Sequence, residues 1–364
     1  MTIETKKYEY KILDVESLKK SKRLRLCRRI SLILFKILLL LLFIVYVIVP
    51  IAFKYSYKFQ THIVFLNYVH LPFNANYTHP ETYGLPNSRN FYLQTEDDMK
   101  LGVWQMLPND FQEPSNKNDI KTKEEYFEKA LGNGQDVIIY MHGNAGSRLT
   151  GHRIELYKIL RKYFHVIAFD YRSYGDSTND SPSEDKLVSD SIFMYNWVAN
   201  RTKGNVYVWG HSLGTSIALH SLSILRKRHL QPKGIVLEAP FNNMREEVSE
   251  FPLAKFFRFL PWFESTITQP LVDSGFTFES DRFICRVDSP ILILHAEDDN
   301  VVPFKLGKKL FEEAKRCRRE NQGNVVFYRF EGKHKYSHKN IYKAPDLETA
   351  LGIFIRGTKK KWSL

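Results

Sequence analysis

Cysteine is scarce in this sequence. Three cysteines occur among 364 residues, at positions 27, 285 and 317, and so few exclude a fold held together by a framework of disulfides. Whether Cys285 and Cys317 form a bond depends on their distance in the fold, which the sequence leaves open. With 43% apolar residues, the chain is instead expected to bury one substantial hydrophobic core.

The sequence also lacks a basic-aromatic motif of the kind that binds nucleic acid, although its formal net charge is +13. Residues 1–29 hold ten Lys or Arg against four Asp or Glu, so about half of the positive excess lies in this short segment. A basic segment beside an apolar stretch is suited to anionic membrane lipids and to fixing topology. We therefore expect no nucleic-acid partner.

Charge is nearly absent from residues 30–53, where Lys36 is the single charged side chain. A helix of this length rises roughly 36 Å, enough to cross a hydrocarbon layer of about 30 Å. A buried helix of a soluble protein is disfavoured because the segment is apolar on all sides. A cleaved signal peptide is disfavoured because a long segment precedes the span and small residues do not follow it. The sequence therefore predicts a transmembrane signal-anchor helix.

Basic residues are concentrated on one side of this span. Only Lys54 and Lys58 closely follow it, whereas seven basic residues closely precede it: Lys19, Lys20, Lys22, Arg23, Arg25, Arg28 and Arg29. Cytoplasmic flanks carry the excess of Lys and Arg, which leaves the N-terminus in the cytosol. We expect a single-pass type II protein of the endoplasmic reticulum membrane, or of the plasma membrane, with its large domain lumenal or extracellular.

Two kinds of modification would be compatible with this topology. Cys27 would lie in the cytosol beside the membrane, where palmitoylation is one interpretation and an unmodified thiol is the other. Asn-x-Ser/Thr triplets begin at Asn76, Asn179 and Asn200. All three would face the lumen and are candidates for N-glycosylation.

Four regions follow from composition: a basic cytoplasmic tail at 1–29, the span at 30–53, a membrane-proximal segment at 54–90, and an α/β domain at 91–364. In the last region strand-like runs alternate with helix-like runs, and residues 109–133 form a polar insertion. The strand-like runs are 91–94, 101–106, 137–141, 166–171, 206–209, 234–237, 291–295 and 325–330. This alternation predicts a mostly parallel sheet flanked by helices, with ligands at the carboxyl ends of the strands.

The most informative motif surrounds Ser212. Residues 210–214 read Gly-His-Ser-Leu-Gly, directly after a strand-like run and directly before a helix-like one at 215–225. In a nucleophile elbow the glycines allow a tight strand-to-helix turn that projects the serine hydroxyl. An ordinary glycine-rich turn is the alternative, which the flanking elements disfavour. Ser212 is therefore a candidate acyl acceptor.

A second small-residue segment provides candidate donors for an oxyanion. Residues 142–146 read His-Gly-Asn-Ala-Gly and follow the strand expected at 137–141. Backbone N–H groups of Asn144 and of Leu213, the residue after the nucleophile, would stabilise negative charge on a carbonyl oxygen. The alternative is a loop whose glycines serve conformation alone.

Acidic and histidine candidates follow the last two strands. Asp298 and Asp299 come after the strand at 291–295, and His334 and His338 come after the strand at 325–330. The order serine, acid, histidine is that of α/β-hydrolases, in which histidine takes the serine proton and the acid orients the imidazole. The two histidines lack the glutamate of a zinc-protease helix, so we expect no metal.

The sequence resembles the α/β-hydrolase-domain family. The resemblance rests on residues 210–215, 243–247, 292–304 and 338–343. It is closest to the branch of the twelfth member, membrane-anchored lysophosphatidylserine and monoacylglycerol lipases. It implies an α/β-hydrolase fold with Ser212 as nucleophile, Asp299 rather than Asp298 as acid, and His338 rather than His334 as base. The polar insertion has no clear counterpart.

A cap insertion is expected at 245–284, because this segment is too long for a simple connection between two strands. Its aromatic side chains would line an acyl-chain pocket, enter the bilayer interface, or form the core of the cap itself. They are Phe251, Phe256, Phe257, Phe259, Trp262 and Phe263.

Together these features predict a membrane-anchored serine hydrolase that cleaves acyl esters of single-chain lipids through an acyl-Ser212 intermediate. Its substrate would be a lipid presented by a membrane, and Lys333, Lys335 and Lys339 would attract an anionic headgroup. The chemistry requires no cofactor, and the oligomeric state is open. A thioesterase or broad small-ester hydrolase is one alternative, and a catalytically silent binding module is the other.

Overall fold

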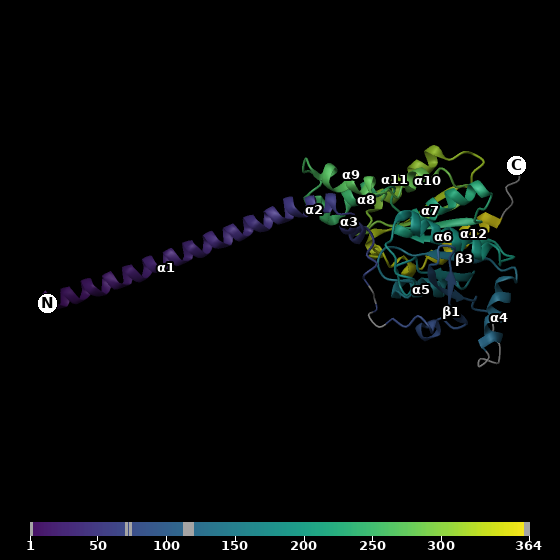
Figure 1. Ribbon diagram of the computed structural model, residues 1–364, viewed down its shortest axis with the longest axis horizontal. Coiled ribbons are helices and arrows are strands. Elements are labelled where there is room, and N and C mark those ends of the chain that lie inside the picture. The colour runs from purple at the N-terminus through teal and green to yellow at the C-terminus, as the bar shows by residue number, and fades with distance from the viewer. Residues whose placement is uncertain (1–2, 70–71, 73–74, 112–119, 360–364) are drawn as a thin grey trace. The chain divides into compact units, whose positions relative to one another are not determined.

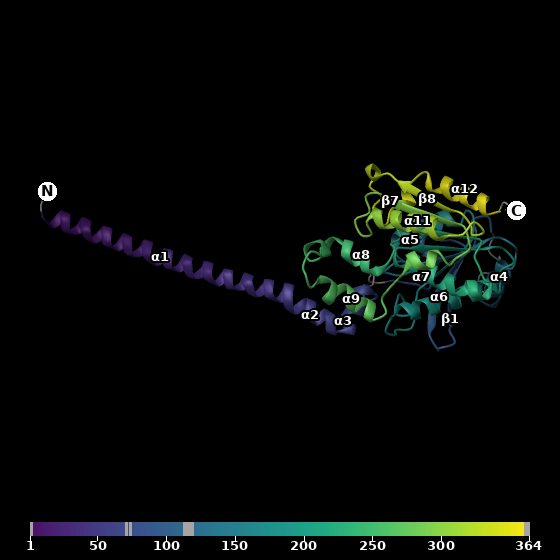
Figure 2. The ribbon, with the colours of Figure 1, turned by 90° about the horizontal axis from the view of Figure 1, so that it is seen from above.

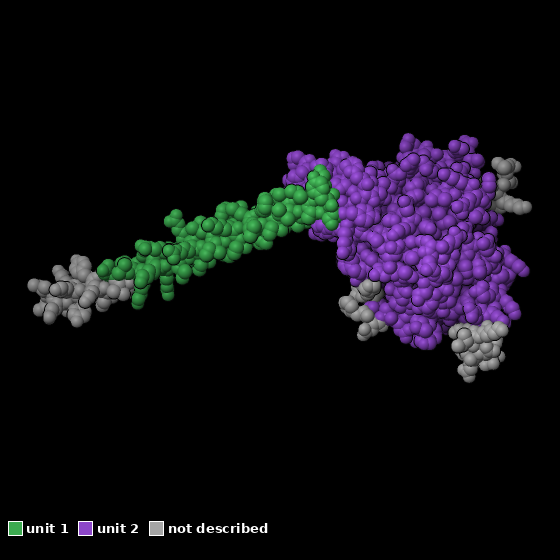
Figure 3. Space-filling view, in the orientation of Figure 1, with its two compact units in different colours: residues 1–56 green, residues 57–364 purple. Residues whose placement is uncertain are grey.

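The computed structural model describes residues 3–69, 72, 75–111 and 120–359. The chain divides into two units, Met1–Ser56 and Tyr57–Leu364 (Figure 3). The first unit carries the apolar span and the second carries the α/β domain, so each is described by itself.

The first unit is helical from Ile3 to Tyr55. α1 (Ile3–Phe43) continues through a π-helical turn, η1 (Ile44–Ile48), into α2 (Val49–Tyr55). The irregular turn directly precedes α2, in which Pro50 has no N–H to donate to the carbonyl of residue 46. By length and composition, residues Ser17–Tyr55 can cross a membrane, and this is the one such helix in the described part of the chain. The expected span at 30–53 lies inside it.

The second unit is built on an eight-stranded sheet (Figures 1 and 2). Its strands run in the order β1-β2-β4-β3-β5-β6-β7-β8. β1 pairs with β2, and β2 with β4, in antiparallel fashion, whereas all later pairs are parallel. The strands are β1 (Ser88–Gln94), β2 (Lys100–Met106), β3 (Val137–Met141), β4 (His165–Phe169), β5 (Val206–His211), β6 (Gly234–Glu238), β7 (Ile291–Ala296) and β8 (Val325–Phe330). Each strand-like run expected from the sequence overlaps one of them.

The five strands from β3 to β7 are buried along their whole length, because helices cover both faces of this sheet. α5 (Gly151–Leu160) and α12 (Leu347–Lys359) share one core cluster with alternate strand residues such as Ile138 and Trp209. α6 (Glu184–Ala199) and α7 (Leu213–Leu225) contact each other and β3, and α11 (Phe304–Cys317) contacts β7 and β8. This two-sided layering is the predicted α/β arrangement.

The segment before the sheet is part of the second unit from Tyr57 onward. It contains α3 (Tyr57–Val64) and η2 (Pro80–Tyr83). The amide of Gly146 donates to the carbonyl of Val69 at 3.2 Å, and Nε1 of Trp104 donates to the carbonyl of Tyr77 at 2.8 Å. From the sequence, residues 54–90 were expected to form a separate membrane-proximal segment. Long-range hydrogen bonds leave no periodic pattern in a sequence, so these contacts with the α/β domain could not be predicted.

Two insertions interrupt the alternation of strands and helices. The polar insertion contains α4 (Ile120–Leu131), whose Phe127 and Leu131 are buried, while its residues 112–119 lie outside the described part. The cap between β6 and β7 contains α8 (Met244–Glu250), η4 (Pro252–Phe256), η5 (Glu264–Thr268), α9 (Gln269–Asp273) and α10 (Ser280–Ile284).

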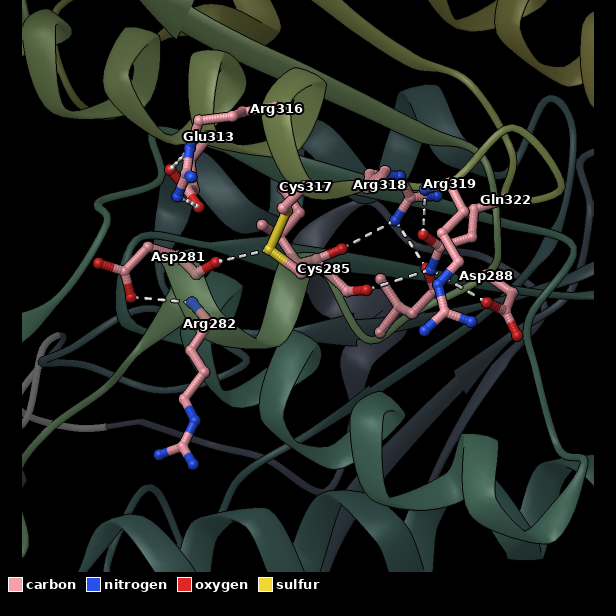
Figure 4. Close-up of a disulfide and its surroundings, with 12 residues drawn as sticks. Asp281, Arg282, Cys285, Asp288, Glu313, Arg316, Cys317, Arg318, Arg319 and Gln322 are labelled. Carbon is pink, nitrogen blue, oxygen red and sulfur yellow. Dashed lines mark hydrogen bonds and ion pairs between the residues drawn. A yellow bond between two sulfur atoms is a disulfide. The ribbon is translucent and has the colours of Figure 1, made fainter.

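A disulfide joins the end of the cap to α11. Cys285 directly follows α10 and bonds to Cys317, the last residue of α11, with their Cα atoms 5.5 Å apart (Figure 4). The sequence left this pairing open, since nothing local brings together two residues that are 32 positions apart.

Candidate active site

Ser212 occupies the turn between β5, which ends at His211, and α7, which begins at Leu213. Its backbone has φ 52° and ψ −120°, a conformation that costs a non-glycine residue on the order of 1–3 kcal/mol. The amide of Ser212 donates to the carbonyl of Glu238 at 2.9 Å, which ties the turn to the end of β6. A strained serine held at the carboxyl edge of the sheet has the geometry of a nucleophile elbow.

The two glycines of the motif allow this turn to form. A Cβ atom on Gly214 would collide with the carbonyl oxygen of Met141, and one on Gly210 would collide with the carbonyl oxygen of Gly214. α7 can therefore approach β3 and β5 this closely only where side chains are absent. The Gly-x-Ser-x-Gly spacing thus has a steric cause in this fold.

Asp299 and His338 lie together, although 39 residues separate them in the sequence. Nδ1 of His338 donates to Oδ2 of Asp299 at 2.8 Å, and Oδ1 of Asp299 accepts from the amides of Val301 and Val302 at 2.9 Å each. Both side chains are buried. The carboxylate thus fixes the imidazole so that its Nε2 carries the free lone pair.

The neighbouring acid and histidine take other positions. Oδ2 of Asp298 accepts from the amide of Ser337 at 3.0 Å, so Asp298 fastens the loop that carries His338. The His334 ring is exposed and stacks on Tyr336, with ring centroids 5.5 Å apart. Only Asp299 and His338 of these candidates form an acid–histidine hydrogen bond.

His338 lies beside the nucleophile turn. Nε2 of His211 contacts the carbonyl oxygen of His338 at 3.0 Å, and the two rings have centroids 4.9 Å apart. Burial lowers the pKa of His211 well below its ordinary value, so its ring is neutral and Nε2–H is the donor. Within the described chain no hydrogen bond joins Ser212 Oγ to His338, as is common for catalytic pairs without substrate. Ser212 is 8% exposed, so little of this residue contacts solvent.

The loop after β3 borders the serine. A Cβ atom built on Gly143 would lie 3.0 Å from Cβ of Ser212. Neither the amide of Asn144 nor that of Leu213 donates a hydrogen bond to another described residue. Both predicted oxyanion donors are therefore chain neighbours of residues at the site, and neither amide has a hydrogen-bond acceptor within the described part of the chain.

The side chain of Asn144 has a role that the sequence did not indicate. Its Oδ1 accepts from the amide of Leu66 at 2.8 Å and from the hydroxyl of Tyr174 at 3.0 Å, while its Nδ2 donates to the carbonyl of Val64 at 2.6 Å. Asn144 thereby fastens the end of α3 to the candidate oxyanion loop. Such contacts depend on tertiary structure, and no local signal announces them.

His295 is a further residue at the candidate site that the sequence did not single out. It lies on β7, where its Nε2 is 3.0 Å from the carbonyl of Val302 and 3.4 Å from Oδ2 of Asp299. Burial by itself would raise the pKa of Asp299, but hydrogen bonds from His295 and His338 outweigh burial and hold that pKa below its ordinary value. Asp299 is therefore ionised throughout the neutral range.

A further carboxyl group lies near this anion. Glu247 is on α8 of the cap, and its Oε2 is buried without a hydrogen-bond partner among the described residues. Burial and the negative charge of Asp299 raise the pKa of Glu247 to about 8. Glu238, which accepts a hydrogen bond from Nε1 of Trp209 at 2.9 Å, has its pKa raised to about 7 by burial. Neither role was predicted.

The predicted cap aromatics divide into two groups. Phe263 is buried, and the Phe257 and Trp262 rings contact each other with centroids 6.4 Å apart. Phe251, Phe256 and Phe259 are exposed. The aromatics therefore do not form one pocket or one core.

The remaining candidates are at the surface. Lys333, Lys335 and Lys339 are exposed, and Lys333 forms an ion pair with Glu331. The three sequon residues Asn76, Asn179 and Asn200 are exposed as well. Cys27 is an exposed free cysteine of the first unit.

Solved structures agree on the fold. An α/β-hydrolase from Vibrio vulnificus matches 82% of this chain and 92% of its own, with a TM-score of 0.58 and 16% identity. An esterase from Pyrococcus furiosus matches 79% of this chain and 95% of its own, with a TM-score of 0.55 and 18% identity. At such identities the likeness establishes the fold alone.

Sequence relatives are much closer. The family described as serine aminopeptidase, S33 matches residues 133–276. Lysophosphatidylserine lipase ABHD12 of Danio rerio is 40% identical over 335 residues, covering 91% of this chain and 86% of the relative. Protein ABHD12B of Homo sapiens is 36% identical over 303 residues, covering 83% and 80%. With this identity over nearly the whole length, the chain belongs to the ABHD12 family of α/β serine hydrolases.

Proposed function

We propose that this protein is a membrane-anchored lipase that hydrolyses the acyl ester of lysophosphatidylserine or of monoacylglycerol. The observation that carries the proposal is the buried hydrogen bond from His338 to Asp299 beside the strained Ser212 turn. The choice of a lysophosphatidylserine headgroup rests on the relatives, which are lysophosphatidylserine lipases. An N-terminal helix able to cross a membrane supports a lipid substrate.

In the proposed mechanism, Nε2 of His338 takes the proton of Ser212 as Oγ attacks the ester carbonyl. The N–H groups of Asn144 and Leu213 stabilise the oxyanion of the tetrahedral intermediate. His338 then protonates the departing glycerol oxygen, which leaves an acyl-Ser212 ester. Water, activated by the same imidazole, cleaves that ester and restores the serine. Asp299 stays ionised and stabilises the imidazolium in both steps.

We infer a type II topology with the hydrolase unit on the lumenal or extracellular side, in the endoplasmic reticulum membrane or at the plasma membrane. The basic residues before the span support this orientation. The Cys285–Cys317 disulfide supports it too, because structural disulfides persist in oxidising compartments. Asn76, Asn179 and Asn200 are exposed and thus accessible to glycosylation on that side.

A fluorophosphonate probe, which reacts with an activated serine, tests the nucleophile. We expect the full chain to be labelled, and Ser212→Ala to lose labelling and to lower kcat on the order of 10⁴-fold or more. Ser216→Ala is the matched control, since this buried serine lies on α7 and its hydroxyl has no partner in the described chain.

Labelling that survives Ser212→Ala would contradict the assignment of the nucleophile. Absence of labelling in the unmodified protein would instead favour a silent binding module. Competition between lysophosphatidylserine, monoacylglycerol, an acyl thioester and a short soluble ester at the same enzyme preparation distinguishes a lysolipid lipase from a thioesterase or broad esterase.

A further inference from the structure

The cap exposes several large apolar side chains that lie close together in the sequence. Leu253, Phe256 and Phe259 are 66%, 64% and 72% exposed, and Phe251 is exposed as well. All lie in the outward loop between α8 and α9 (Figure 2). We call Leu253, Phe256 and Phe259 the cap patch. Large apolar side chains this exposed, and within seven residues of one another in the chain, are typical of a surface that contacts a membrane or another protein.

The rest of the second unit does not resemble this loop. Its other exposed aliphatic side chains are single residues on separate elements, such as Leu230, Val326 and Ile353. Scattered exposed apolar residues are normal on a soluble surface. Three exposed Phe within nine residues are not, and among the described residues of this unit the strongly exposed Phe side chains all belong to residues 251–259.

The charges of this loop favour a lipid surface. Residues 251–263 contain Lys255 and Arg258 and no acidic residue. Arg258 forms an ion pair with Glu250 at 2.8 Å, whereas no acidic side chain of the described chain pairs with Lys255. Apolar side chains interleaved with Lys or Arg are typical of segments that enter the interface of a bilayer, where the cations reach phosphate groups.

The loop is also firmly connected to the hydrolase core. Glu250, at the end of α8, contacts Lys305 on α11 at 2.5 Å as well as Arg258 in the loop. Glu246, one turn earlier, contacts Lys309 at 2.5 Å. These ion pairs join α8 to α11, the helix that follows the Asp299 loop, so that contact made by the loop would fix the orientation of the active site.

We propose that the cap patch inserts into the interface of the bilayer in which the protein is anchored, and so docks the active site on the membrane that supplies its substrate. The proposal rests on the function proposed above. The chain reaches the hydrolase unit directly after the apolar helix ends at Tyr55, so a bilayer is the surface always within reach of this unit.

Insertion depth provides the first test. The full chain carrying Cys27→Ser and Phe259→Cys is labelled at residue 259 with an NBD fluorophore and reconstituted in vesicles of phosphatidylcholine and phosphatidylserine. Ile353→Cys is the matched control, because Ile353 is 59% exposed on α12. We expect the label at 259 to be blue-shifted and quenched by lipids with spin labels on their acyl chains, and the label at 353 to remain water-like.

Two results would overturn the proposal. The first is a label at 259 that stays as water-like as the label at 353. The second is a blue shift that lipid quenchers do not affect, since this would mean that the patch is covered by protein, either a second copy of the chain or another partner.

Activity provides the second test and separates docking from chemistry. We compare a triple variant, Leu253→Ser, Phe256→Ser and Phe259→Ser, with Ile353→Ser. We expect the triple variant to keep its rate on a short soluble ester and to lose roughly tenfold or more on lysophosphatidylserine in vesicles, and Ile353→Ser to change neither. Equal losses on both substrates, or no loss, would contradict docking. An unmodified enzyme that cleaves neither substrate would refute the proposed function, while the fluorescence test would still decide insertion.

Discussion

At the scale of single residues, the site depends on how neighbouring groups divide protons among them. Burial by itself would raise the pKa of Asp299, but hydrogen bonds from His295 and His338 outweigh burial and hold that pKa below the ordinary value. Glu247 has no hydrogen-bond partner for Oε2 in the described structure. Burial and the negative charge of Asp299 raise the pKa of Glu247 to about 8. One carboxyl group is thus kept charged and the other neutral by their surroundings.

The neutral Glu247 makes stability depend on pH. Its folded pKa of about 8 exceeds the ordinary 4.5, so the folded state holds this proton more tightly, and stability falls as pH rises between these values. We expect Glu247→Gln to remove that decline, which contributes at most about 1.4 kcal/mol per pH unit. Thermal unfolding of the full chain at about pH 5 and about pH 8 measures it.

Glu246→Gln is the matched control on the same helix. Partial burial alone would raise the pKa of Glu246, but the ion pair with Lys309 lowers it. The stability that this ion pair contributes is therefore present at neutral pH and is lost as pH falls below about 4.5. The two variants should therefore shift the pH profile in opposite senses. Identical profiles for Glu247→Gln and the unmodified protein would mean that Glu247 is not held neutral.

At the scale of elements, all candidate groups come from loops that follow the carboxyl ends of parallel strands. β3 leads to Asn144, β5 to Ser212, β7 to Asp299 and β8 to His338. Because β3 pairs with β5, and β5 is linked through β6 to β7 and β8, parallel pairing brings all four loops to one edge. The close approach of α7 at Gly210 and Gly214 then fixes the serine among them.

The elbow glycines give a direct test of this packing. Gly214→Ala would place a methyl group against the carbonyl of Met141, and we expect it to cost about 1–3 kcal/mol or more of stability. In Gly357→Ala the new methyl group meets no atom within 4 Å, and α12 should gain about 0.5–1 kcal/mol. Thermal unfolding of both variants measures the difference. A tolerated Gly214→Ala would show that α7 does not pack this tightly.

The disulfide offers a second test at this scale. It closes a loop across 32 positions and fastens the cap's last helix, α10, to α11 (Figure 4). Replacing both cysteines with serine should lower stability by about 2–4 kcal/mol. Unfolding with and without a reductant gives the measurement, and the double variant should no longer respond to the reductant. A response that persists would place the reducible bond elsewhere.

At the scale of the whole molecule, a helix suited to crossing a membrane precedes an α/β-hydrolase unit. The family relationship covers nearly the full length of both chains, so it includes more than the catalytic fold. A lipase acting on a membrane lipid gains from this arrangement because its substrate is dissolved in the same bilayer.

The proposed orientation predicts N-glycans on the hydrolase unit. We expect the cellular protein to shift in electrophoretic mobility on endoglycosidase treatment, and the shift to vanish when Asn76, Asn179 and Asn200 are all changed to Gln. Single variants identify the sites in use, since each side chain is exposed. A mature protein that does not respond to the enzyme would count against a lumenal hydrolase unit.

Sequence alone determined the features that depend on neighbours in the chain. Apolar composition marked the helix within Ser17–Tyr55, and alternating runs marked the strands. The spacing of Gly210, Ser212 and Gly214 marked the elbow. These signals are local because strand, helix and tight-turn geometry is set by adjacent residues.

Tertiary structure alone decided which distant groups meet. Spacing did not distinguish Asp299 from Asp298, whereas folding put Asp299 on His338 and Asp298 on the backbone of Ser337. It also formed the Cys285–Cys317 bond and brought His211 to the carbonyl of His338. Hydrogen bonds and disulfides need particular distances and angles between atoms far apart in the chain, and only the packed sheet and helices supply them.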